Sequence, residues 1–223
     1  MLLNLICNIA VPTVVLMKFS TDRWLGPLWG LVVALIFPVV YGIWDFATRK
    51  KMNFISVLGF VSVLLSGGLG LMKADGFWFA VKDAAVPSLI GIAVLVSLRT
   101  KNPLVNQLFY NDQIVDVQRV DAALAERGER PAFEKLMRNA SIWLAVSFLA
   151  SAVLNFGLAR YLLKSPPATP EFNEELGKMH ILVWPVIVIP SMVVMMTVFW
   201  KLITGLTKLT GLSTDEIFKT EKK

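Results

Sequence analysis

The chain has 223 residues, of which 56% are hydrophobic and 17% charged, and its net charge is +6. This composition leaves too little polar surface for a water-soluble fold, and the long apolar stretches exclude a sizeable soluble catalytic domain. One cysteine, Cys7, cannot form an internal disulfide, and one histidine, His180, excludes metal sites that need two or more imidazoles or thiolates. We therefore expect an all-α polytopic membrane protein with no metal ion and no cofactor.

Apolar runs bounded by charged residues predict about six transmembrane helices within a single membrane domain, 1–223. They lie at about 2–17, 24–46, 53–72, 77–98, 141–163 and 179–203. The first run is short and carries Asn8 and Pro12, and the fourth carries Lys82 and Asp83. The first run has no basic residues before it and no A-x-A-like cleavage site after it, so we interpret it as a retained helix rather than a signal peptide.

Lysine and arginine are distributed unevenly between the two sides of these spans. Fifteen lie after the second, fourth and sixth spans, and six lie on the opposite side. Because basic residues near helix ends resist translocation, this asymmetry predicts that both termini are cytoplasmic. The basic cytoplasmic rim would face anionic membrane lipids. Nucleic-acid binding is not expected, because the charges are scattered and no base-stacking module is present.

The segments outside the spans have recognisable sequence patterns. In the cytoplasmic loop 99–138, the residues from Asn111 to Arg127 have apolar positions at helical spacing, and Gly128 follows where a helix would stop. We expect an amphipathic helix there, lying on the lipid headgroups or under the bundle, and a new helix from Pro131 into the fifth span. In the extracytoplasmic loop 164–178, residues 165–170 predict a stiff extended link, followed by a short acidic turn. Residues 207–223 form a cytoplasmic tail.

Small residues and prolines mark positions where the spans would pack closely or bend. A face of small residues on the third span would allow another helix to approach closely; its members are Ser62, Ser66, Gly67, Gly68 and Gly70. Prolines inside spans free a backbone carbonyl and predict helix kinks; they are Pro12, Pro38, Pro87, Pro185 and Pro190. These kinks have two interpretations, ordinary membrane-helix prolines or a hinge beside a binding site.

A candidate polar site inside the membrane comprises Lys82, Asp83, Asn155 and Asn8. An ionisable residue within a span costs about 2.5 to 3.5 kcal/mol at the bilayer centre and suggests a binding site or pathway. Lys82 is only about five residues, or roughly 8 Å, from the outer end of its span, so snorkelling to the interface is the alternative. Adjacent helical residues project about 100° apart, so we expect Lys82 and Asp83 not to form an ion pair.

Two enzyme signatures are incomplete in this sequence. Asp112 and Asp116 resemble part of the first aspartate motif of intramembrane prenyltransferases, but Val115 stands where another acid is needed and no second cluster follows. Asp75-Gly76 begins like the lipid phosphotransferase signature, whose later residues are missing. We therefore predict a protein that is not an enzyme. The Ala-Val-Pro sequences at 10–12 and 85–87 raise the alternative of a 3+3 inverted repeat.

The chain resembles the bacterial intracellular septation protein A family over about three quarters of its length. The resemblance is carried by Lys51 through Gly67-Gly68-Leu69, Asp75 to Lys82, Lys101-Asn102-Pro103-Leu104, Lys135-Leu136, Asn139, Trp143 and Asn155. The loop 105–134 is longer here, and Phe172-Asn173 is followed by acids where the family tends to be basic, so the fit is to a longer, uncharacterised sister group. The resemblance implies a bacterial inner-membrane protein connected with envelope synthesis and cell division, with no catalytic residues to carry over.

Two functions follow from these observations. The first is a non-catalytic inner-membrane protein that supports envelope biogenesis and septation through contacts with envelope-synthesis or division proteins. The second is a small transporter or lipid-handling protein with a polar site near Lys82, Asp83 and Asn155; as six helices make a narrow bundle, it could act as a homodimer. A polar cavity at mid-membrane depth would favour the second function, and outward snorkelling of Lys82 and Asp83 would favour the first.

Overall fold

The structure is a computed structural model that describes residues 10–49, 65–100, 103–110 and 114–218. Over these residues the chain is helical and contains no strand beyond one isolated β-bridge. Four helical stretches in this part of the chain are long and apolar enough to cross a membrane: Gly26–Trp44, Gly76–Ser97, Arg130–Leu162 and Pro170–Thr210. The prediction of an all-α, multi-pass membrane fold is confirmed at this level.

The predicted first and third spans fall partly outside the described residues. Of 2–17 the structure describes the part from residue 10, where α2 (Val11–Val14) continues into the π-helical segment η2 (Val15–Phe19). Of 53–72 it describes the part from residue 65, which is helical to residue 71. The second span corresponds to α3 (Gly26–Arg49) and the fourth to α5 (Gly76–Ser97).

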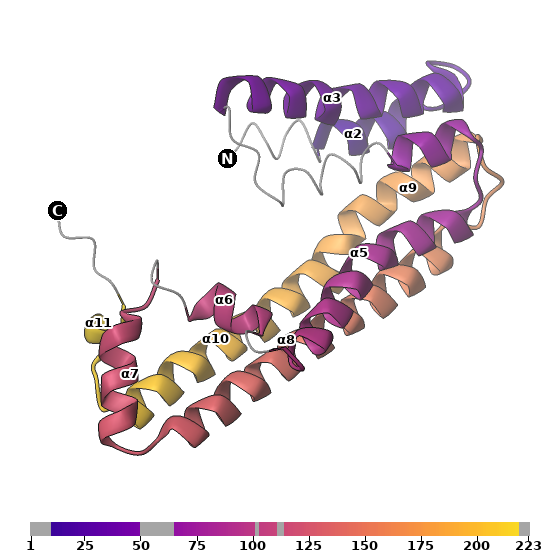
Figure 1. Ribbon diagram of the computed structural model, residues 1–223. Coiled ribbons are helices and arrows are strands. Elements are labelled where there is room, and N and C mark those ends of the chain that lie inside the picture. The colour runs from indigo at the N-terminus through magenta and orange to yellow at the C-terminus, as the bar shows by residue number, and fades with distance from the viewer. Residues whose placement is uncertain (1–9, 50–64, 101–102, 111–113, 219–223) are drawn as a thin grey trace. The chain divides into compact units, whose positions relative to one another are not determined.

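The chain forms two compact units, and α5 and α8 (Arg130–Leu162) contribute residues to both. Unit one combines Met1–Val86 with Ala152–Val188. In it α2 and η2 lie against α3 and against α9 (Pro170–Val183), and α2 runs beside α3 in Figure 1. The core is apolar and includes Leu16, Leu31 and Leu176. Phe79 of α5 and Phe172 of α9 meet edge to face, with ring centroids 5.5 Å apart.

The loop before α9 is shorter than the sequence suggested. We expected an extended link followed by an acidic turn, but α9 begins at Pro170, and Glu171, Glu174 and Glu175 lie within it. The Thr169 hydroxyl caps the helix by accepting from the Phe172 N–H at 3.2 Å. Proline suits a first helical position, because the N–H it lacks would have no partner there, and acidic residues suit the positive end of the helix dipole. The prediction of an acidic turn was therefore wrong.

Unit two combines Pro87–Ser151 with Ile189–Lys223. Its remaining helices are α6 (Leu104–Phe109), α7 (Val117–Glu126), α10 (Ile189–Thr210) and α11 (Thr214–Ile217). The predicted amphipathic helix is present as α7, but it begins at Val117 rather than near Asn111, because the Asp116 carboxylate caps it by accepting from the Arg119 N–H at 3.2 Å. Residues 111–113 lie outside the described part of the chain.

The apolar face of α7 is buried within unit two. Val120 and Leu124 are fully buried, as is Ile217 of α11, and α7 contacts both α10 and α11. The Asp116 N–H donates to the Ile217 carbonyl at 2.8 Å, which brings the tail beside α7 (Figure 1). Of the two positions expected for this helix, the structure therefore favours packing against other helices. Gly128 has φ +66° after α7, and Pro131 lies in the first turn of α8, as predicted.

Candidate binding cavity in unit one

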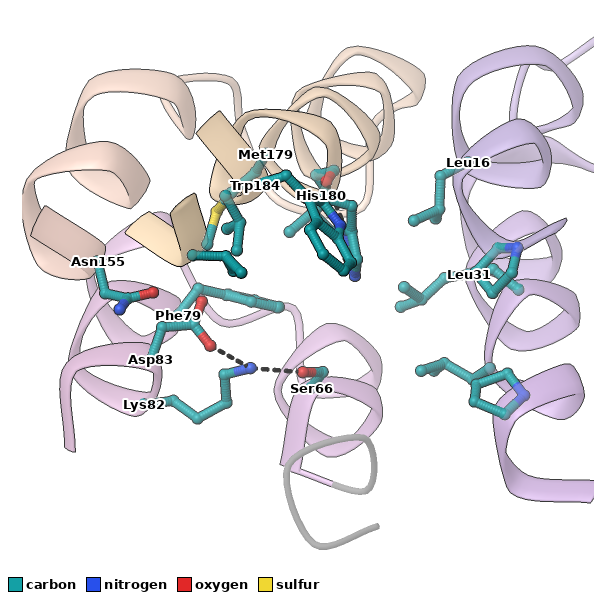
Figure 2. Close-up of a pocket in the computed structure, with 17 residues that line it drawn as sticks. Leu16, Leu31, Ser66, Phe79, Lys82, Asp83, Asn155, Met179, His180 and Trp184 are labelled. Atoms are coloured by element: carbon teal, nitrogen blue, oxygen red, sulfur yellow. Dashed lines mark hydrogen bonds and ion pairs between the residues drawn. The ribbon is translucent and has the colours of Figure 1, made fainter. Parts of the chain in front are cut away.

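A cavity of about 380 Å³ lies within unit one. Its lining comes from α2, η2, α3, the helix at 65–71, α5, the last turns of α8, α9 and η3 (Trp184–Val188), so it is built from segments far apart in the sequence. Most of the wall is apolar, with Leu16 and Leu31 on one side and Phe79 and Met179 across from them (Figure 2). Cavities of roughly 300 to 1,000 Å³ with a few polar groups are typical of small-molecule sites.

Lys82 makes two polar contacts at one end of the cavity. Its ammonium lies 2.6 Å from the Asp83 Oδ1 and donates to the Ser66 hydroxyl at 2.6 Å (Figure 2). The two charged side chains are only 12% and 18% exposed. Lys82 thus extends into the cavity. In a low-dielectric setting the pairing offsets part of the cost of burying each charge.

The prediction that Lys82 and Asp83 do not pair was wrong. Their Cβ atoms do point in directions about 100° apart on the helix. However, the lysine side chain has four methylene groups, and its end can bend back over that angle to reach the neighbouring carboxylate. The estimate from helix geometry considered only the direction in which each side chain leaves the backbone. A long side chain can bend away from that direction to reach a partner when water is absent.

Two further polar or aromatic side chains line the cavity and were not predicted. The His180 Nδ1 lies 2.8 Å from the Leu176 carbonyl. A carbonyl can only accept, so this contact assigns the proton to Nδ1 and leaves Nε2 of the neutral ring as an acceptor. Trp184, one helical turn further, also lines the cavity and is 40% exposed. Their i, i+4 spacing places both on one helix face, but the sequence does not show which helices that face meets.

The predicted polar and small residues have different positions. Asn155 lines the cavity with Lys82 and Asp83, and Asn8 lies outside the described residues. Ser66 accepts the hydrogen bond from Lys82 instead of serving only as a small packing residue. A Cβ on Gly67 would lie 2.9 Å from Leu35 Cδ1, and one on Gly70 would overlap Leu31 Cδ2. Nothing lies within 4 Å of a Cβ on Gly68, and Ser62 falls outside the described residues.

The five prolines divide between the cavity and other positions. Pro12 and Pro38 are buried and line the cavity, Pro12 in α2 and Pro38 inside α3. Pro185 falls in the π-helical segment η3, two of whose residues line the cavity. Pro87 in α5 and Pro190 in α10 belong to unit two. Short π-helical segments inside α-helices are frequently found at functional sites.

The acidic residues of the two incomplete enzyme signatures have structural roles where they are described. Asp75 accepts from the Phe77 N–H at 3.1 Å and so caps the start of α5. Asp116 caps α7, and Asp112 lies outside the described residues. Across the part of the chain that the structure describes, no three His, Cys, Asp or Glu side chains gather in a group that could hold a metal ion.

Comparison with protein-family models, with curated proteins and with solved structures yields no match. The fold itself indicates the class of the protein. Its long apolar helices make it a multi-pass helical membrane protein. A largely apolar cavity with an ion pair at one end lies within its first unit.

Proposed function

We propose that the protein binds a small amphipathic molecule in the cavity of unit one, as a lipid-handling protein or small transporter of the bacterial inner membrane. The observation that carries the proposal is that Lys82 and Asp83 line this cavity and pair there at 2.6 Å. Intramembrane ionisable residues that face a cavity, rather than the interface, typically mark a binding site or a pathway.

The shape and chemistry of the cavity support an amphipathic ligand. Leu16, Leu31 and Met179 provide an apolar wall that suits a hydrocarbon chain. Lys82 and Asp83 provide charged groups at one end, where a polar headgroup could replace some of the lost hydration. A fully hydrophilic solute would leave the apolar wall uncovered, and a pure hydrocarbon would leave the charged end unused.

The resemblance to the septation protein A family supports an inner-membrane location and a connection with envelope synthesis, a process that handles lipids. The proposal includes six spans, cytoplasmic termini and no catalytic step, with a 3+3 inverted repeat as a further option. Lipid handling would make membrane lipids the first partners of the protein. A homodimer would make the narrow six-helix bundle wider within the membrane.

A second candidate function is non-catalytic support of septation through protein contacts. The observation that favours it is the packing of α7 on α11, where Val120, Leu124 and Ile217 are fully buried. This packing gives the predicted cytoplasmic side a folded surface that envelope-synthesis or division proteins could recognise. Under this alternative the ion pair in the cavity would be a structural feature, and its removal would leave partner binding intact.

Native mass spectrometry of the full chain, released from its own membranes, distinguishes the two functions. We expect a bound mass that is retained by the wild type and lost from the double variant Lys82→Met, Asp83→Asn. The matched control is Lys178→Met, Glu174→Gln, which removes an exposed pair whose atoms lie 2.7 Å apart. Equal retention of bound mass by both double variants, or no bound mass on the wild type, would exclude the cavity as the binding site.

A further inference from the structure

The ion pair of Lys82 and Asp83 leaves part of its hydrogen-bonding capacity unused. A ligand that satisfies this capacity must carry matching polar groups. We propose that the polar end of the cavity recognises a zwitterionic group, an ammonium joined by a short linker to a phosphate or carboxylate. This inference rests on the proposed function and specifies which headgroup the cavity selects. Phe79 lies next to Asp83, and His180 and Trp184 belong to the same lining.

Each member of the pair retains capacity for one further partner. The Lys82 ammonium has three N–H donors, and among the described residues it uses one on Asp83 and one on Ser66. The Asp83 carboxylate receives Lys82 at Oδ1, and each of the two oxygens of a carboxylate can accept further hydrogen bonds. A ligand that supplies one anionic oxygen to Lys82 and one N–H to Asp83 would satisfy both.

The charges select against ligands with a single charge. Lys82 and Asp83 are opposite charges with their nearest atoms 2.6 Å apart, so together they present no net charge. An anion that approaches the Lys82 ammonium also meets the Asp83 carboxylate, and a cation that approaches Asp83 also meets Lys82. In a site of low dielectric, such like-charge contacts are poorly screened. A zwitterion oriented antiparallel to the pair has two attractive contacts instead.

Aromatic and acceptor groups on the cavity lining favour the ammonium half of such a ligand. Phe79 and Trp184 line the same cavity, and an ammonium over an aromatic face gains a cation–π attraction that is larger away from water. The His180 Nε2 is an acceptor when the ring is neutral, because Nδ1 is engaged with the Leu176 carbonyl. Figure 2 shows Phe79 next to Asp83 at this end of the cavity.

The same chemistry occurs in a lipid headgroup and in a free zwitterion. Phosphatidylethanolamine carries it with hydrocarbon chains, and glycerophosphoethanolamine carries it without them. The apolar wall would add affinity only for the lipid, in proportion to the area it covers. The experiment therefore includes both molecules, and their relative affinity identifies the source.

The test is ligand exchange on the full chain in detergent, followed by native mass spectrometry. The probes are short-chain phosphatidylethanolamine, phosphatidylglycerol of equal chain length and N-acetylated phosphatidylethanolamine, which lacks the ammonium. We expect phosphatidylethanolamine to bind at least about tenfold more tightly than the other two, which corresponds to about 1.4 kcal/mol. Asp83→Asn should reverse the preference toward phosphatidylglycerol, because it leaves the Lys82 charge without its counter-ion. Lys178→Met should change nothing.

Each outcome supports or overturns the inference. Equal binding of all three lipids in a Lys82-dependent manner, or preference for phosphatidylglycerol by the wild type, would overturn the zwitterion while leaving the proposed binding function intact. Binding of none of the probes, including glycerophosphoethanolamine, would overturn the zwitterion; together with a wild type that carries no bound mass from its own membranes, it would overturn the proposed function as well. Competition by glycerophosphoethanolamine at equal affinity would support the zwitterion and identify a free molecule as the ligand. The N-acetylated lipid tests the wild type directly, so the inference stays falsifiable if Asp83→Asn does not fold.

Discussion

Two glycines of the helix at 65–71 offer a test of how this segment packs against α3. A Cβ added to Gly70 would overlap Cδ2 of Leu31, a side chain that is 7% exposed and borders the cavity, so Leu31 would have to shift. Nothing lies within 4 Å of a Cβ added to Gly68. Both glycines lie in the same helix, so replacing either by alanine gains a similar helix propensity of about 0.5 to 1 kcal/mol.

The difference between Gly70→Ala and Gly68→Ala therefore isolates the packing cost. Overpacking costs about 1 to 3 kcal/mol, and the lower end applies here because Leu31 can shift toward the cavity, so Gly70→Ala should be less stable than Gly68→Ala by about 1 kcal/mol. Gly68→Ala itself should be slightly more stable than the wild type. Thermal unfolding of the three proteins in one detergent measures the order, and each kcal/mol corresponds to roughly 2 to 4 °C in Tm for a chain of this length. Equal Tm values for the two variants would refute the close approach of Gly70 to Leu31.

Further expectations concern both units. Ile217→Ala, at a fully buried position, should lower the free energy of unfolding by about 2 to 5 kcal/mol in denaturant titrations; a loss no larger than that of Ile142→Ala, at 37% exposure, would contradict this. Hydrogen bonds from the Ser213 N–H and hydroxyl, then the nearby Arg119 charge, lower the pKa of Glu216 below its ordinary value of 4.5. Ionised Glu216 therefore stabilises the fold above that value, and this stabilisation is lost as the pH falls through the lower folded pKa. Glu216→Gln should thus lower the free energy of unfolding at neutral pH but not in acid. Asn173→Ala removes a 2.6 Å hydrogen bond to a backbone carbonyl of α3 and should cost about 1 to 3 kcal/mol in the same titrations; an unchanged midpoint would argue against that bond.

Features that depend on local sequence could be predicted well. The helix stop at Gly128 and the restart at Pro131 follow from the backbone preferences of those two residues, and both are present. The apolar length of α5 likewise identifies it as a candidate span without knowledge of its neighbours. The start of α7 was misplaced because several Asn and Asp residues precede it, and each of them is a competent cap. In the described part of the chain, Asp116 is the one whose carboxylate accepts from the Arg119 N–H.

Features that depend on how helices meet could not be predicted. The cavity brings Ser66, Lys82, Asn155 and His180 together from four helical segments. Periodicity indicates which residues share a face of one helix, but it does not indicate which faces meet. The sequence did identify Lys82 and Asn155 as costly or polar inside a membrane. It left His180 aside, because a single histidine carries no spacing pattern to interpret.

The most direct test of the account is an experimental structure of the full chain in lipid nanodiscs, determined with the lipids that purify with it. The central claim predicts that Lys82 remains directed into the cavity beside Asp83 and Ser66, with non-protein density between this end and the wall formed by Leu16 and Leu31. A cavity closed by side chains, with the Lys82 ammonium extended to the membrane interface, would contradict it.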